Sequence, residues 1–173
     1  MAGKIAPSVF LDTNTVIGWL AREKDSATSA ISGILNEIHA KRLRAVLSQL
    51  TKLEVLECKH DDTMFRAWRQ LQARPNVEVF GVTKKVIDVA YQIRNYYQAI
   101  REGDATAKKP PRQPDCILLA TAIVTGVDCF VSYDGGKMDP RHLSPLELNG
   151  IVAGQWNLSV VEPEHLNIQG LAV

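Results

Sequence analysis

The sequence has few cysteines, little net charge and no long apolar run. Its 3 cysteines lie in apolar segments without CxxC spacing, so neither a disulfide framework nor a cysteine zinc site is expected. The 20 basic residues nearly balance 19 acidic ones, which excludes an overall positive field as the source of nucleic-acid affinity. No apolar run reaches membrane-spanning length, and the N-terminus lacks the apolar core of a signal peptide. We therefore expect a cytoplasmic protein with no membrane partner.

What the sequence does have is an ordinary globular composition. Apolar residues make up 46% of its 173 residues and charged residues 23%, which is enough for one substantial core without stabilising disulfides or metals. We expect a single domain over residues 1–173. Two stretches inside it lack periodicity, a loop at about 102–114 and a second irregular stretch at about 135–154, which has room for one short helix.

Short apolar runs alternate with helical patterns along the chain. The runs predict strands at 9–11, 45–48, 77–82, 129–133 and 157–161. Apolar residues at helical spacing predict helices at about 13–20, 31–38, 50–57, 61–71, 83–101 and 116–125. This alternation is typical of an α/β fold with a mainly parallel sheet.

Carboxylates follow several of these elements at comparable places. Asp12 and Asp134 come directly after predicted strands, Glu54 falls near the first turn of a predicted helix, and Asp115 stands at the entrance of another. Parallel α/β sheets collect ligands outside the carboxyl ends of their strands. We therefore expect these four side chains to converge at one edge of the sheet. The simpler interpretation of Asp12, a cap for the next helix, stays open at this point.

Four converging carboxylates imply a bound cation. Each close pair would repel by about 4 kcal/mol at an effective dielectric constant of about 20, unless a cation neutralises the charge. Oxygen ligands without His or Cys favour Mg²⁺ or Mn²⁺, which keep several waters and accept phosphate oxygens. Phosphodiester hydrolysis is the natural reaction for such a site.

Four segments of the sequence resemble the successive motifs of PIN domains, in order and in approximate spacing. They are Val-Phe-Leu-Asp-Thr-Asn at 9–14, Ser-Gln-Leu-Thr-Lys-Leu-Glu at 48–54, Asp-Cys-Ile-Leu-Leu-Ala-Thr-Ala at 115–122 and Phe-Val-Ser-Tyr-Asp at 130–134. The resemblance implies a three-layer α/β/α fold with a central, mainly parallel sheet. It also implies a metal-dependent ribonuclease that cuts RNA. Many small PIN proteins are VapC-like toxins that an antitoxin holds inactive and that often form homodimers.

The same resemblance assigns roles to particular residues. By position, the acidic tetrad that binds the metal and carries catalysis corresponds to Asp12, Glu54, Asp115 and Asp134. Asn14 and Ser132 correspond to its polar companions, with Ser132 standing where Thr is more usual. Glu57 and Asp139 are close enough in sequence to substitute as ligands for Glu54 and Asp134.

The two irregular stretches make this chain longer than the compact toxins. Basic residues in and near them are candidate RNA contacts, although a solvated periphery explains them equally well. These residues are Lys108, Lys109, Arg112 and Lys137.

Two other interpretations stay open. One is a PIN fold that binds RNA or protein without catalysis. The other is a haloacid-dehalogenase-like phosphatase, whose opening motif also places an Asp at a strand end. Asn14 cannot protonate a leaving group as the second Asp of those enzymes does, so this alternative is the weaker one.

Overall fold

The structure is a computed structural model, and it describes residues 6–21, 25–58 and 61–172. Its strands form one six-stranded sheet in the order β3-β2-β1-β4-β6-β5. The strands are β1 (Ser8–Leu11), β2 (Arg44–Ser48), β3 (Val77–Phe80), β4 (Cys129–Val131), β5 (Gly150–Val152) and β6 (Trp156–Val161). The helices are α1 (Thr13–Ala21), α2 (Asp25–His39), α3 (Gln49–Glu57), α4 (Asp62–Gln72), α5 (Lys84–Gly103) and α6 (Gln113–Thr125), with short 3₁₀ helices η1 (Pro145–Leu148), η2 (Pro163–His165) and η3 (Gly170–Ala172).

The order of the strands creates a switch point beside β1. From β1 the chain proceeds through β2 to β3 on one side, and it then returns to add β4 on the other side. β1 pairs in parallel with both β2 and β4, and β4 pairs in parallel with β6. In open parallel sheets the crevice at such a reversal is the usual ligand site. A ligand site is therefore expected at the carboxyl ends of β1 and β4.

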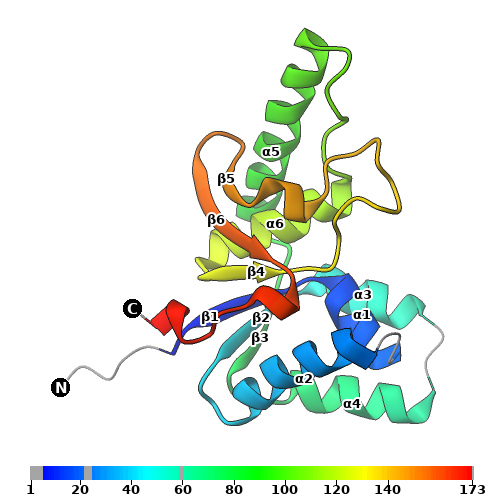
Figure 1. Cartoon of the computed structure of the whole chain (residues 1–173), viewed down its shortest axis with the longest axis vertical. Helices are drawn as coiled ribbons and strands as arrows, with labels where there is room; N and C mark the ends of the chain where they lie inside the picture. Colours follow the sequence, from blue (N-terminus) through cyan, green and yellow to red (C-terminus); the bar gives the residue numbers. More distant parts are fainter. Residues whose placement is uncertain (1–5, 22–24, 59–60, 173) are drawn as a thin grey trace.

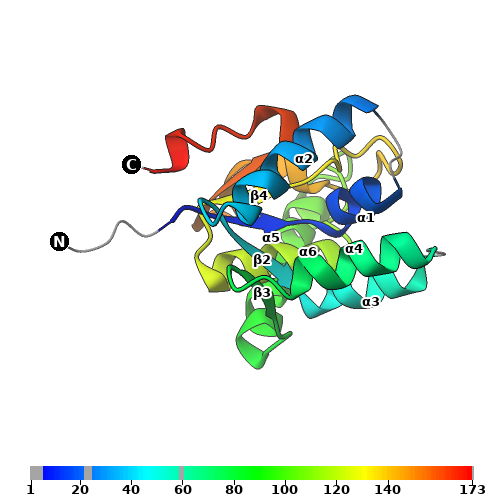
Figure 2. The ribbon, with the colours of Figure 1, turned by 90° about the horizontal axis from the view of Figure 1, so that it is seen from below.

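Alternating side chains of β1 divide the core into two halves. Val9 and Leu11 pack with α1, α2, α3 and α4 on one face of the sheet. Phe10 packs on the opposite face with α5 and α6, and its ring stacks on that of Phe130 with centroids 5.0 Å apart. Figure 1 shows the sheet between these two groups of helices, and Figure 2 shows α1 to α4 gathered on their face. The predicted three-layer α/β/α fold with a mainly parallel sheet is confirmed.

Several boundaries differ from those expected. The helix α6 begins at Gln113 and includes Pro114 in its first turn, where the missing N–H of proline costs no hydrogen bond. The loop before it is correspondingly shorter than predicted. The second irregular stretch contains the 3₁₀ helix η1 and also β5, a three-residue edge strand that the sequence did not predict. Its Gly150 and exposed Ile151 give no strand pattern.

None of the helices in the described residues combines the length and the apolar character needed to cross a membrane. The longest, α5, carries charged residues along its length, and the apolar helices α1 and α6 have only 9 and 13 residues.

Candidate active site

Asp12 lies at the switch point, immediately after β1. Its backbone N–H donates to the carbonyl of Val131 at 3.0 Å, which joins the ends of β1 and β4. Its side chain is only 4% exposed. Oδ1 accepts from the backbone N–H of Thr13 at 2.7 Å, and Oδ2 accepts from Ser132 Oγ at 2.6 Å. The chain itself therefore fixes the orientation of both carboxylate oxygens.

Ser132 and Asn14 connect Asp12 to the segment that carries Asp134. The Oγ of Ser132 accepts from Asn14 Nδ2 at 3.2 Å and from the backbone N–H of Asp134 at 2.9 Å. Asn14 Oδ1 accepts from the backbone N–H of Tyr133 at 3.0 Å. The two residues that the sequence proposed as polar companions thus lie beside Asp12, and they hold the turn after β4 against the start of α1.

The other three carboxylates reach the same place from separate elements. Glu54 is on α3, where its Oε2 accepts from Thr13 Oγ1 at 2.5 Å. Asp115 is in the first turn of α6 and is partly buried. Asp134 follows β4, and its Oδ1 accepts from the backbone N–H of Gly136 at 2.9 Å.

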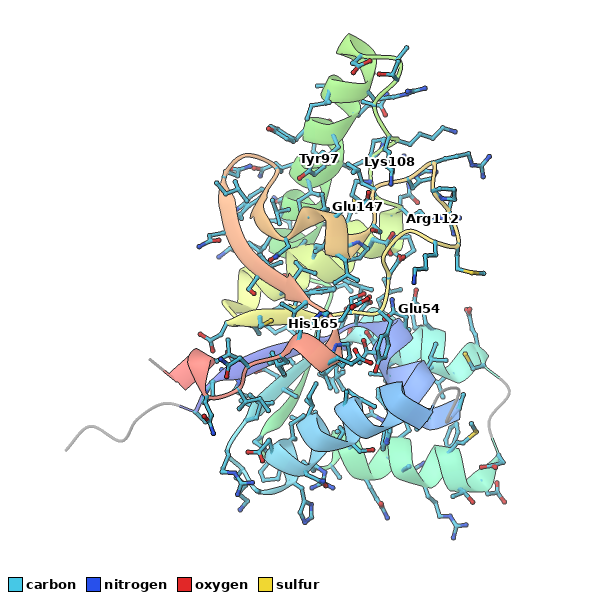
Figure 3. The ribbon with its side chains drawn as sticks, in the orientation of Figure 1. Glu54, Tyr97, Lys108, Arg112, Glu147 and His165 are labelled. Carbon is cyan, nitrogen blue, oxygen red and sulfur yellow. The ribbon has the colours of Figure 1, made fainter. Side chains whose placement is uncertain are left out.

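A single cavity of about 320 Å³ collects all four carboxylates. Figure 3 labels Glu54, one of these four carboxylates. The lining residues are Asp12, Thr13, Asn14, Ile17, Glu54, Asp115, Leu118 and Asp134. The convergence expected from the sequence is therefore present.

Burial and mutual repulsion perturb two of these carboxylates. Burial is the main cause that raises the pKa of Asp12 to about 7, and the charges of Asp115 and Asp134 raise it further, against the hydrogen bond from Ser132. Burial likewise raises the pKa of Asp115 to about 6, and the charges of Asp134 and Glu54 add to it. Each of the four carboxylates thus acts electrostatically on at least one other. The cavity carries more negative charge than its surroundings neutralise.

The donor set fits a hard divalent cation. Mg²⁺ and Mn²⁺ prefer carboxylate oxygens, and Mg²⁺ needs only one or two of them beside its waters. Within the described ranges, no three His, Cys, Asp or Glu side chains already stand at metal-binding distances. Burial first, and then the neighbouring carboxylates, raise the pKa of Asp12 and of Asp115, and a bound cation would oppose both effects.

The two alternative ligands lie outside the cavity lining. Glu57 is exposed near the end of α3. Asp139 is paired with Arg112 at 2.5 Å and with Arg141 at 3.2 Å. Hydrogen bonds from Arg112 and Arg141 lower the pKa of Asp139 to about 2. The structure therefore does not bring Glu57 or Asp139 to the four carboxylates.

The candidate RNA contacts differ in their availability. Lys108 forms an ion pair with Glu147 at 2.5 Å, and Arg112 is engaged by Asp139. Lys109 and Lys137 are exposed. Figure 3 shows Lys108 and Arg112 above Glu54, on the same side of the molecule.

Sequence reasoning missed one polar residue of the cavity lining, Thr13. Thr13 donates its hydroxyl hydrogen to Glu54, and its Oγ1 lies 3.1 Å from that of Thr51. The only signal in the sequence was its position directly after Asp12, which is also explained by helix initiation.

A second cavity of about 380 Å³ lies between α1 and α4. Asp61, a carboxylate on its lining, accepts hydrogen bonds from the backbone at the start of α4 and is a helix cap. The lining residues are Trp19, Leu20, Ala21, Asp61, Thr63, Met64 and Ala67. Although this cavity is larger, its lining among the described residues carries no group of titratable side chains, so the carboxylate cavity is the better candidate for chemistry.

Comparison with known proteins gives one family and several solved structures. The family model described as "PIN domain" matches residues 9–137, a span that contains all four carboxylates. The fold is similar to that of VapBC2 from Rickettsia felis bound to a DNA fragment from their promoter, at 14% identity and a TM-score of 0.54, covering 90% of this chain and 98% of that one. It is also similar to DNA-bound VapBC from Salmonella typhimurium, at 16% identity and a TM-score of 0.57, covering 91% and 98%.

No curated protein matches the sequence. The structural likenesses are too distant in sequence to show more than the fold, whereas the family model covers most of the chain. The match to the PIN domain model also excludes the haloacid-dehalogenase-like phosphatase. The chain belongs to the PIN domain family.

Proposed function

We propose that this protein is a metal-dependent endoribonuclease that hydrolyses RNA phosphodiester bonds at the carboxylate cavity. The observation that carries the proposal is the convergence of Asp12, Glu54, Asp115 and Asp134 on one cavity at the switch point of a PIN domain. A buried group of acids is costly for folding unless it serves a cation.

The four carboxylates would hold Mg²⁺ or Mn²⁺. Such an ion, when bound, supplies an activated water and stabilises the departing oxygen of the phosphodiester. The chain's own contribution is orientation. Ser132 and Asn14 fix Asp12 and the segment of Asp134, and the hydroxyl of Thr13 holds Glu54. Ile17 and Leu118 supply apolar wall on the cavity lining.

An antitoxin partner, a homodimer and a cytoplasmic location belong to the same proposal. The support for an antitoxin is the likeness to structures described as VapBC. The proposal also includes a single domain over residues 1–173. The competing proposal is a PIN domain that binds RNA without cutting it.

The test is cleavage of a mixed panel of RNA and single-stranded DNA in EDTA, Mg²⁺ or Mn²⁺. We expect metal-dependent cutting of RNA that leaves 5′-phosphates and is lost in Asp12→Asn and in Asp115→Asn. Asp88→Asn is the matched control, because Asp88 is an exposed carboxylate on α5 that pairs with Lys84. Normal cutting by Asp12→Asn would show that the site is wrong. If folded wild-type protein binds RNA and cuts none of the panel, the competing proposal is favoured.

A further inference from the structure

Two loops beside the carboxylate cavity are joined through their backbones. One precedes α6 at 104–112, and the other follows β4 at 137–144. The backbone N–H of Lys109 donates to the carbonyl of Arg141 at 2.8 Å, and the N–H of Leu143 donates to the carbonyl of Lys109 at 3.0 Å. The loops therefore form a short parallel bridge rather than two independent connections.

Side chains strengthen this bridge. His142 Nδ1 lies 2.7 Å from the carbonyl oxygen of Pro110, and Arg94 on α5 donates to the carbonyl of Pro111 at 3.1 Å. The chain is thus anchored immediately before Arg112. Any side chain presented from this segment starts from a fixed backbone, which lowers the entropy lost when it binds a ligand.

One carboxylate at this bridge holds two arginines. Asp139 accepts from Arg112 Nη2 at 2.5 Å and from Arg141 Nε at 3.2 Å. Asp139 is only 13% exposed, whereas Arg112 is 59% and Arg141 75% exposed. A single negative charge cannot neutralise both guanidinium groups, so one positive charge is in excess. The exposed Lys109 and Lys137 on the same two loops increase this excess.

This excess of positive charge lies next to the cavity. Arg112 is three residues before Asp115, and its charge acts on both Asp115 and Asp134. On the side of β6, the neighbouring charges are negative instead, because Glu162 and Glu164 both act on Tyr133. The basic side chains next to the cavity are therefore on the side of α6, whereas the charges beside Tyr133 are negative.

We propose that these four side chains form a phosphate-binding surface, the basic ledge, that holds the backbone of single-stranded RNA on the α6 side of the cavity. The basic ledge consists of Lys109, Arg112, Lys137 and Arg141. Asp139 is then the counterion that Arg112 and Arg141 share. The inference rests on the proposed function, because the strand on the ledge is the one that enters the cavity.

The arrangement favours a nucleic acid over an acidic protein segment. A phosphodiester strand could bind both the ledge and a cation held by the four carboxylates. Carboxylates of an acidic peptide would meet the ledge alone. Lys108 is not part of the ledge, since Glu147 already neutralises it.

The test measures binding of a fluorescein-labelled single-stranded RNA by anisotropy in EDTA, where cleavage does not interfere. We expect the double variant Arg112→Gln/Arg141→Gln to bind about tenfold more weakly, with the slope of log K against log salt reduced by about 0.7 for each lost phosphate contact. Arg42→Gln is the matched control. Arg42 is 64% exposed and ion-paired with Glu37, but it precedes β2, at the amino-end edge of the sheet.

Asp139→Asn tests whether RNA binds to the arginines themselves or to a metal ion that Asp139 holds. Removing this charge should leave RNA binding in EDTA at least as tight as in wild type, because the arginines lose only their counterion. Weaker binding by Asp139→Asn would overturn its assigned role. Equal weakening by Arg42→Gln, unchanged binding by the double variant, or no binding by wild type would each overturn the ledge. Competition by a polyglutamate peptide as effective as unlabelled RNA would favour a protein partner instead.

These outcomes are independent of the cleavage assay. If wild type cuts RNA and the double variant binds RNA normally, the ledge is wrong and the nuclease stands. If RNA binds through the ledge but neither metal supports cutting, the nuclease is wrong and the ledge stands.

Discussion

Asp12→Asn should stabilise the metal-free protein at pH 8. Burial first, and then the charges of Asp115 and Asp134, raise the pKa of Asp12 from 3.8 to about 7 in the folded state. Between these two values the folded protein keeps a proton that the unfolded chain releases, so stability falls as the pH rises and the loss is complete above about pH 7. A difference of about three pKa units corresponds to about 4 kcal/mol of unfolding free energy.

The replacement recovers less than this full amount, because the hydrogen bonds of the site change. The amide oxygen of Asn at position 12 can still accept from the backbone N–H of Thr13. Its amide nitrogen, however, faces Ser132 Oγ, which already accepts from Asn14 and from the backbone of Asp134. An unsatisfied buried donor costs about 1 to 3 kcal/mol. The net gain at pH 8 is therefore about 1 to 3 kcal/mol.

The assay is urea unfolding of both proteins in EDTA at pH 5 and pH 8, with Asp88→Asn as the control for loss of an exposed carboxylate. At pH 5 wild-type Asp12 is largely protonated, so the advantage of the variant should disappear or reverse. Adding Mg²⁺ at pH 8 should stabilise wild type more than Asp12→Asn. If the unfolding free energies of the two proteins change in parallel between pH 5 and pH 8, the coupled carboxylate cluster does not exist as described.

Three further substitutions test two hydrogen-bonding side chains and one backbone conformation. Ser132→Ala removes the hydroxyl that joins Asp12 to Asp134, so it should cost about 1 to 3 kcal/mol in urea unfolding and slow RNA cleavage, whereas Ser132→Thr should retain both. Tyr97→Phe removes the acceptor for the backbone N–H of Ala153 and should cost about 1 kcal/mol; unchanged stability would mean that water replaces it. Gly126→Ala places a side chain at φ 64° where no atom lies within 4 Å, so a cost of about 1 kcal/mol in thermal unfolding would be purely conformational, and no cost would contradict this.

The sequence was sufficient to locate the four carboxylates because each one is tied to the end of a regular element. Asp12 and Asp134 follow apolar runs that can only be buried strands, and parallel strands bring such ends to one edge. Asp115 lies in the first turn of α6, whereas Glu54 lies one turn further along α3 than expected, and both helices leave the same edge. Local patterns plus one rule of topology thus predicted most of the geometry.

Contacts between loops could not be predicted in this way. The sequence suggested Asp139 as an alternative metal ligand. Nothing in its local sequence shows that Arg112, on another loop, pairs with it. The strand β5 was not predicted for a related reason. It is stabilised by pairing with β6 and by the hydrogen bond from Ala153 to Tyr97, not by a strand pattern in its own residues. Both features depend on which distant segments meet.

The hydrogen bond from Ser132 to Asp12 spans 120 residues of chain. At the usual rate of about 5 to 20 residues per second, a ribosome that has made Asp12 needs on the order of ten seconds more to make Ser132. During that interval the nascent chain carries Asp12 without β4, Asp134 or the turn that orients them. A growing polypeptide therefore has no assembled carboxylate cavity until most of its length has been synthesised.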